Sequence, residues 1–275
     1  MKILLPAGVI LCLMLASCQK EINYALRDRN IAPQLLTKIV SKSGNDSSTM
    51  TFGYNSAKKL MSLNILTVSG GATSVTSERV ERDAQGIITR LIIKDDQYAQ
   101  LGLDSVVTVV TYANGAYTSK VTTIDLGVGL YKDSVSLIYD GEGRVIREQT
   151  FDDVGTGTYD ESAKIEYTYG GYNISAINYY SFDASTSTYT LLVNYAYQAY
   201  DDHLAAATLG NEAFVFDSPE FFCVNNATHS TITAPNSPTQ TYNTSYTYNN
   251  ANKPTSATAN VQPGDGTTTG TYYYQ

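Results

Sequence analysis

The chain has 275 residues, a formal net charge of −8, 23 tyrosines, three cysteines and no tryptophan. An acidic chain without a lysine or arginine cluster lacks the basic surface that nucleic-acid binding needs, so we expect no nucleic acid among its partners. A composition rich in tyrosine, together with threonine and valine, favours strands.

The first element along the chain is a secretory signal over residues 1–17. Lys2 precedes an apolar run, Ile3 to Ala16, that is too short to remain as a membrane-spanning helix. The sequence Leu15-Ala16-Ser17-Cys18 resembles the bacterial lipobox, and the resemblance implies that Cys18 is lipidated and becomes the first mature residue. Several acyl chains anchor a protein stably, so we expect a membrane partner and a place in the cell envelope. The protein is then an outer membrane lipoprotein, either periplasmic or surface-exposed.

Residues 18–33 follow as a polar tether, and residues 34–275 form a single β domain. Cys12 leaves with the signal and Cys18 carries the lipid, so Cys223 has no cysteine to pair with inside the mature chain. Packing and hydrogen bonds must therefore stabilise the domain.

A degenerate repeat runs through this domain. Its clearest copy is LIYDGEGRVIRE, Leu137 to Glu148, in which alternating apolar residues are followed by a turn sequence and a second apolar run. The marker positions of the copies are Tyr54, Arg82, Tyr112, Tyr139, Tyr169, Tyr197, Tyr248 and Tyr274. They are 28, 30, 27, 30, 28, 51 and 26 residues apart, which indicates one structural unit repeated along the chain.

Each unit predicts a β-hairpin. Val135, Leu137 and Tyr139 share one sheet face, Asp140 to Gly143 form a turn, and Val145 to Phe151 return antiparallel. No stretch has a sustained helical apolar period. The fold expected is therefore all-β: an antiparallel meander of about 15 strands in one long, strongly twisted and curved sheet or open barrel. The recurrent tyrosines either build its core or form an aromatic platform that stacks sugars or peptides.

The motif Tyr-Asp-x-x-Gly-Arg-Val at Tyr139–Val145 resembles the YD repeat of RHS and teneurin proteins, whose repeats wrap into β-shells. With its lipobox and tether, the chain is also similar to uncharacterised envelope lipoproteins of Bacteroidota. The resemblance covers residues 34–275 and implies a scaffold without an assigned reaction. The glycine-arginine step is intact only at Gly143-Arg144, and the chain is far too short for the large closed shell that encapsulates a toxin.

An insertion at 205–241 interrupts the repeats. It concentrates Phe214, Phe216, Phe221 and Phe222 in nine positions, and such a cluster must be buried or must bind something. Two interpretations remain open: the insertion plugs an open end of the sheet, or it forms the lid or wall of a ligand site with Cys223 buried and inert nearby.

The search for catalytic and metal-binding residues is mostly negative. His203 falls at a repeat's turn, and His229 lies at the polar end of the insertion, without a spacing typical of metal ligands. The acidic residues Asp152, Asp153, Asp160 and Glu161 lack the alternating spacing of a calcium loop, which favours a solvated loop. We expect no metal, no cofactor and no enzyme activity.

Two Asp-Ser-Val tripeptides resemble the acceptor sequence of Bacteroidota O-glycosylation. They place Ser105 and Ser134 at the predicted entry of a strand, where glycosylation is sterically feasible. A role of the tripeptide in starting the strand would explain its occurrence equally well.

Three functions remain compatible with these residues. We favour a non-catalytic, lipid-anchored scaffold that binds a glycan, a peptide or a partner protein of the envelope. A purely structural envelope lipoprotein explains the same residues without a binding site. A periplasmic or surface hydrolase would need a clustered acid, base or nucleophile that the sequence does not offer.

Overall fold

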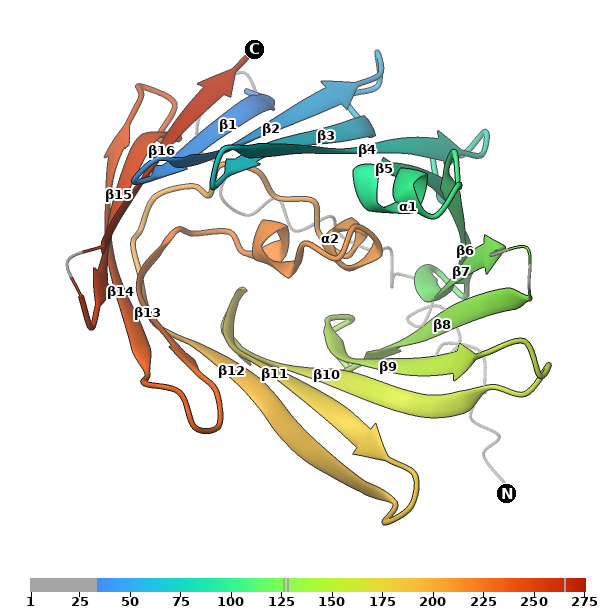
Figure 1. Cartoon of the computed structure of the whole chain (residues 1–275). Helices are drawn as coiled ribbons and strands as arrows, with labels where there is room; N and C mark the ends of the chain where they lie inside the picture. Colours follow the sequence, from blue (N-terminus) through green and yellow to red (C-terminus); the bar gives the residue numbers. More distant parts are fainter. Residues whose placement is uncertain (1–33, 126, 128, 265) are drawn as a thin grey trace, which may run out of the picture.

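The computed structural model describes residues 34–125, 127, 129–264 and 266–275. These residues form a closed antiparallel β-barrel of 16 strands (Figure 1). The strands are β1 (Leu36–Ser43), β2 (Asp46–Tyr54), β3 (Leu60–Ser69), β4 (Ala72–Arg82), β5 (Ile88–Asp95), β6 (Val106–Ala113), β7 (Ala116–Asp125), β8 (Leu130–Tyr139), β9 (Val145–Asp153), β10 (Asp160–Gly170), β11 (Asn173–Asp183), β12 (Thr188–Tyr200), β13 (Ala227–Thr233), β14 (Gln240–Tyr248), β15 (Pro254–Gln262) and β16 (Gly266–Tyr274). The short helices are α1 (Asp96–Gln100), α2 (Glu212–Val215) and the 3₁₀ helix η2 (Pro219–Phe222).

Each strand pairs with its neighbours in sequence, and β1 closes the barrel against β16. Ile39 lies opposite Tyr272 in this seam, and Leu35 and Gln275 exchange backbone hydrogen bonds of 3.1 and 3.0 Å at its end. The all-β antiparallel meander expected from the sequence is confirmed. The sheet is closed, however, and has no free edge in the described chain.

The tight turns of the repeat all lie at one end of the barrel, which we call the turn end. In the turn from Asp140 to Arg144, the Asp140 carboxylate accepts hydrogen bonds from the backbone amides of Glu142 (2.9 Å) and Arg144 (3.0 Å). Gly143 has φ of 79°, a conformation that favours glycine, and this explains the glycine in the turn of the clearest repeat. The same turn geometry, with an aspartate or asparagine at its start, recurs at residues 55–59, 83–87 and 249–253.

A β-bulge follows each of these turns and sets which residues face inward. Tyr139 pairs with Val145 while Ile138 pairs with Arg147, so Ile146 is an extra residue in β9. As a result Val145 and Glu148, three residues apart, both point into the barrel.

This spacing is repeated around the barrel. The first inward residue after the turn is Leu60, Ile88, Tyr117, Val145 or Ile174, and the second is Leu63, Leu91, Lys120, Glu148 or Ile177. All ten are buried, and the eight apolar ones belong to the hydrophobic core. Burying one aliphatic side chain of this size contributes roughly 1.5–3 kcal/mol.

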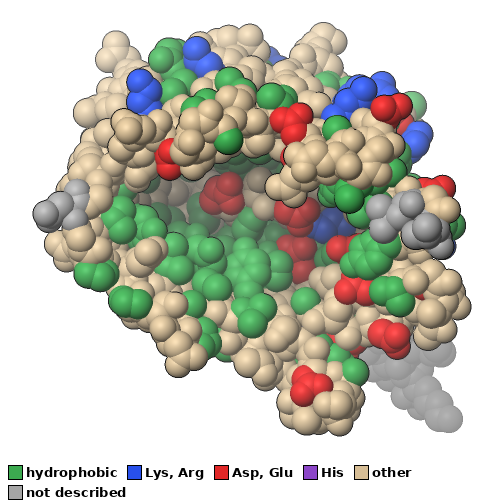
Figure 2. Space-filling view, in the orientation of Figure 1, with side chains coloured by type: hydrophobic (Ala, Val, Ile, Leu, Met, Phe, Trp, Pro, Cys, Tyr) green, Lys and Arg blue, Asp and Glu red, His purple; other side chains and the backbone are tan. Residues whose placement is uncertain are grey.

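The chain between β12 and β13, residues 201–226, leaves the wall and lies inside the barrel, with α2 and η2 at its centre (Figure 1). We call this segment the excursion. It is displaced from the predicted insertion at 205–241, because Ala227–Thr233 already form β13 and Gln240 begins β14. The excursion leaves and re-enters at the turn end, whereas the opposite end, the mouth, opens into a hollow with hydrophobic and acidic side chains on its wall (Figure 2).

The described residues include no helix with the length and hydrophobicity needed to cross a bilayer.

Candidate functional site

The marker tyrosines of the repeat lock the turn end together. Tyr139 donates a hydrogen bond of 2.6 Å to the carbonyl oxygen of Tyr117, and Tyr54 donates one of 2.9 Å to that of Leu36. In each case the tyrosine ends one strand and its partner lies near the start of the preceding strand. The bond therefore braces a pair of adjacent strands, which gives the recurrent tyrosine a structural role.

The bracing also corrects the assignment of one marker and shows a variation at another. In the sixth unit Tyr200, and not Tyr197, donates to a strand-start carbonyl, that of Ile174. In the seventh unit Tyr246 donates to Ala227 at 3.0 Å, whereas Tyr248 donates to the Asp201 carboxylate. Tyr200 is thus the marker of the sixth unit, since it ends β12, whereas Tyr248 keeps its marker position directly before the turn at 249–253 and directs its hydroxyl to the excursion.

Two ion pairs fix the excursion to the wall, one between Arg82 and Glu212 and one between Lys120 and the more exposed Asp217. Arg82, which stands where other units have tyrosine, forms a two-pronged pair with Glu212 of α2, with both nitrogen–oxygen distances at 2.8 Å. Lys120 donates to the carbonyl oxygen of Phe214 at 2.8 Å and to the carboxylate of Asp217, and its Nζ lies 3.3 Å from Glu148 Oε2. The excursion is thus held in one position by charges on β4, β7 and β9.

All four phenylalanines of the excursion are buried, with exposed fractions of 0–7 %. Phe214 packs edge-on against Tyr167 with ring centroids 5.0 Å apart, and Phe221 packs similarly against Phe52 at 5.6 Å. The cluster therefore closes the turn end as a plug would. Phe221 also forms part of a cavity wall, so features of both interpretations of the insertion are present.

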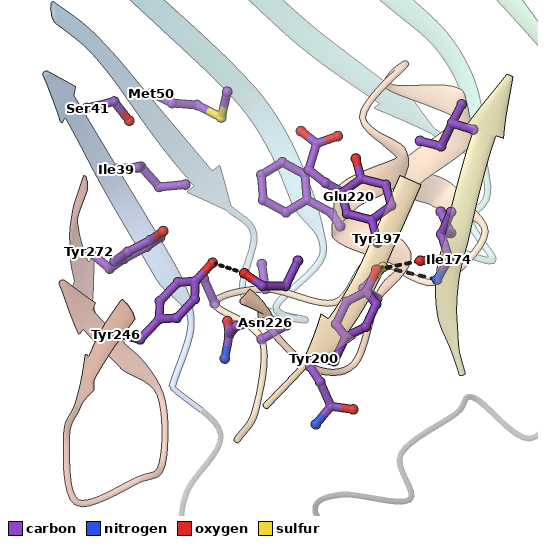
Figure 3. Close-up of a pocket in the computed structure, with 18 of the residues that line it drawn as sticks. Ile39, Ser41, Met50, Ile174, Tyr197, Tyr200, Glu220, Asn226, Tyr246 and Tyr272 are labelled. Carbon is purple, nitrogen blue, oxygen red and sulfur yellow. Dashed lines mark hydrogen bonds between the residues drawn. The ribbon is translucent and has the colours of Figure 1, made fainter. Parts of the chain in front are cut away.

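A cavity of about 320 Å³ lies between the excursion and the wall (Figure 3). Its apolar lining includes Ile39 and Met50 from the first two strands, Ile177 from β11, and Phe221. Its further lining residues are Ser41, Ser48, Ile174, Tyr197, Tyr200, Ala205, Ala206, Ala207, Glu220, Cys223, Asn225, Asn226, Ala227, Tyr246 and Tyr272.

The tyrosines in this cavity are of two kinds. The hydroxyls of Tyr200 and Tyr246 are bound to backbone carbonyls. In contrast, the hydroxyls of Tyr197 and Tyr272 have no hydrogen-bond partner anywhere in the described chain. These two hydroxyls are placed to bond to a molecule in the cavity.

Glu220 is the one charged side chain among the described residues that line the cavity, and its carboxylate points into it (Figure 3). The carboxylate keeps contact with solvent through the mouth, yet the barrel wall surrounds it. This enclosure disfavours the ionised form and raises the pKa of Glu220.

A second polar group lies on the lumen wall around Lys120. Besides Glu148 and Asp217, the carboxyls of Glu78 and Asp133 lie near it, and each has a buried oxygen without a hydrogen-bond partner in the described chain. Burial raises the pKa of Glu78 to about 7 and that of Asp133 to about 6, in both cases with nearby carboxylates adding to the effect. Four carboxyls around one ammonium make this part of the lumen acidic.

Sequence reasoning missed both Glu220 and the Lys120–Glu148 pair. The signal for the pair was present, because Lys120 and Glu148 stand three residues after the first buried residue of their units, where other units have Leu63, Leu91 and Ile177. The bulge that brings this position inward gives a spacing of three residues, which does not fit the two-residue alternation expected of a strand.

The remaining predicted residues lie outside this site. His203 stacks on Tyr248 with ring centroids 3.7 Å apart, and His229 on β13 bonds to Asn243 at 2.7 Å. Cys223 is buried, and burial raises the pKa of its thiol. No group of His, Cys, Asp and Glu within the described ranges could hold a metal ion.

The acidic loop and Ser105 lie at the ends of strands, whereas Ser134 lies in the middle of one. Asp153 accepts from the backbone amides of Gly155, Thr156 and Gly157, so it orders its own hairpin between β9 and β10. Ser105 directly precedes β6, as expected, but Ser134 is the fifth residue of β8 and does not lie at a strand entry. Residues 1–33, with the signal, Cys18 and the tether, lie outside the described chain.

No family model and no curated protein matches this sequence. Among solved structures, a porin-like protein from Bacteroides uniformis is 18 % identical with a TM-score of 0.52, covering 88 % of this chain and 99 % of that one. A porin-like protein from Bacteroides vulgatus is 10 % identical with a TM-score of 0.55 and the same coverage. At these identities the likeness concerns the barrel fold alone.

Proposed function

We propose that this chain is a non-catalytic, lipid-anchored envelope protein that holds a small amphipathic ligand inside its barrel. The cavity between the excursion and the wall is the observation that carries the proposal. Its volume of about 320 Å³ falls within the range of small-molecule sites, roughly 300–1,000 Å³.

The lining supports a ligand with an apolar body and a polar end. Ile39, Met50, Ile177 and Phe221 offer apolar contact, while polar atoms are few and stand at defined places. Predominantly apolar walls with a few convergent polar groups are typical of ligand sites. The sequence left a glycan, a peptide or a partner protein as the expected ligand. Because the phenylalanine cluster is buried, it offers no outer surface to a glycan or a protein, and we favour a small molecule inside the barrel.

The outer face of the barrel supports an anchor separate from the barrel itself. It carries ion pairs such as Arg147–Glu166 at 2.9 Å and Arg90–Glu81 at 3.2 Å, and hydroxyl pairs such as Thr247–Thr255. Charged side chains on the lipid-facing side of a barrel are destabilising in a bilayer, so these ion pairs favour an anchor separate from the barrel wall. Lipidation of Cys18 would then supply the membrane link, and the Bacteroides origin of the structural neighbours supports an envelope location.

The test is binding of the neutral fluorophore N-phenyl-1-naphthylamine to the purified domain, 34–275. Ser48 faces the cavity from β2, so Ser48→Trp fills it, whereas Ser47→Trp places the same ring on the outer face of the same strand. We expect saturable binding by the wild type and by Ser47→Trp, and its loss in Ser48→Trp. Absence of saturable binding, or binding that Ser48→Trp leaves unchanged, would overturn the proposed function.

A further inference from the structure

The cavity holds a carboxylate that no other described residue pairs with. Glu220 lies on η2 between Pro219 and Phe221, and its side chain has only its own backbone amide as a donor and no cation of the described residues in contact. Glu220 is reached by solvent through the mouth, so its charge is tolerated without a partner in the described chain. Its carboxylate is therefore free to pair with a ligand that brings a positive charge into the cavity.

Aromatic faces surround the same space. Tyr197, Tyr246 and Tyr272 line the cavity together with Glu220, and the labelled side chains converge on one volume (Figure 3). The face of an aromatic ring attracts a cation, so an ammonium group inserted among such rings is stabilised by them. Rings and carboxylate therefore favour the same ligand charge.

The rest of the lumen wall excludes the opposite charge. Glu78, Asp133 and Asp217 lie around the single ammonium of Lys120, which is already bonded to Asp217 and Glu148. Acidic side chains are visible inside the hollow that leads to the cavity (Figure 2). An anionic ligand would approach through a negative field and find no free cation in the described lining.

We propose that the ligand of this cavity is a cationic amphiphile, an apolar body with an amine head, and that Glu220 is the residue that selects it. This inference rests on the proposed function, because it names the chemical class of the ligand that the cavity holds. The amine head pairs with the Glu220 carboxylate and contacts the tyrosine rings, while the body packs on Ile39, Met50 and Phe221.

The experiment uses three probes with one body and three head charges: 4-phenylbutylamine, 4-phenylbutan-1-ol and 4-phenylbutyrate. Their dissociation constants are measured by ligand-observed NMR titration against the wild type, Glu220→Gln and Glu142→Gln. Glu142 is a matched control because it lies in an exposed turn, where it pairs with Arg144.

We expect the amine to bind the wild type about tenfold more tightly than the alcohol, a difference of about 1.4 kcal/mol, because only the amine brings a charge that pairs with the carboxylate. The carboxylate should bind most weakly. Glu220→Gln should remove the amine preference and leave alcohol binding nearly unchanged, and Glu142→Gln should behave as the wild type.

Each outcome bears on one of the two proposals. Equal binding of amine and alcohol by the wild type overturns the inference and leaves the proposed function standing, and this comparison needs no variant. An amine preference that survives in a folded Glu220→Gln protein also overturns the role of Glu220. If none of the three probes binds and N-phenyl-1-naphthylamine does not bind either, the proposed function and the inference fall together.

Discussion

The two kinds of tyrosine in the barrel predict opposite responses to the loss of a hydroxyl. Tyr139 donates a hydrogen bond of 2.6 Å to the Tyr117 carbonyl in a part-buried setting. Tyr139→Phe removes this bond and leaves the carbonyl with one acceptor site unfilled. A net hydrogen bond contributes about 0.5–1.5 kcal/mol and an unsatisfied buried partner adds to the loss, so we expect a cost of about 1–2 kcal/mol.

Tyr197→Phe is the matched control, because the Tyr197 hydroxyl has no hydrogen-bond partner in the described chain while its ring lines the lumen. We expect its free energy of unfolding to lie within about 0.5 kcal/mol of the wild type. Tyr246→Phe, which loses a 3.0 Å bond to Ala227, should resemble Tyr139→Phe.

The assay is urea unfolding of the domain at 25 °C followed by far-ultraviolet circular dichroism, with equal m-values required for the comparison. In thermal unfolding the same loss should lower Tm by about 2–4 °C per kcal/mol for a domain of this size. The reasoning is refuted if Tyr197→Phe costs as much as Tyr139→Phe, because the hydroxyl bonds would then not explain why tyrosine recurs in the repeat.

Three further predictions concern charge and anchoring. A carboxyl whose pKa is raised by folding destabilises the fold only once the unfolded chain has lost its proton. Glu78→Gln should therefore raise the free energy of unfolding at pH 8 by about 1–2 kcal/mol, and this gain should disappear as the pH falls from about 7 to 4.5. A gain in urea titrations that does not depend on pH would contradict this. Lys120→Leu should lower the free energy of unfolding by about 3–5 kcal/mol, because it leaves the Glu148 carboxylate buried without its partner. The double variant Lys120→Leu/Glu148→Leu should lose clearly less than the sum of the two single variants, and additive losses in a double-mutant cycle would disprove this. Cys18→Ser in the full precursor should move the protein out of the membrane fraction; continued sedimentation with membranes would argue against the lipid anchor.

Local features of the hairpin could be predicted from the sequence because neighbouring residues determine them. The turn at Asp140–Gly143 and the antiparallel return from Val145 follow from the aspartate side chain, the glycine and the alternation of apolar residues. The closure of the barrel could not be predicted in the same way. Whether β1 meets β16 depends on the twist accumulated over all 16 strands, and no residue near Leu36 or Tyr274 encodes it alone.

The site was predicted only in part. The phenylalanine-rich excursion stood out by composition, and its burial follows from that composition. Glu220 was invisible as a site residue, because its importance comes from where η2 directs it and not from its neighbours in sequence. The Lys120–Glu148 pair joins two strands that lie on either side of β8, so only an alignment of the repeats by their bulges would have brought the two positions together.

The first strand begins at the turn end, where the excursion fills the barrel, and the C-terminal residue lies beside it. Everything that precedes Gln34 in the chain therefore joins the barrel at its filled base. If Cys18 carries the lipid, the attachment to the membrane starts at this base and leaves the mouth clear of the chain that precedes the barrel. The 16 residues 18–33 can reach about 55 Å when extended, so the attachment would limit the distance of the barrel from the bilayer and not its orientation. A ligand could then enter the mouth either from solution or from the lipid surface.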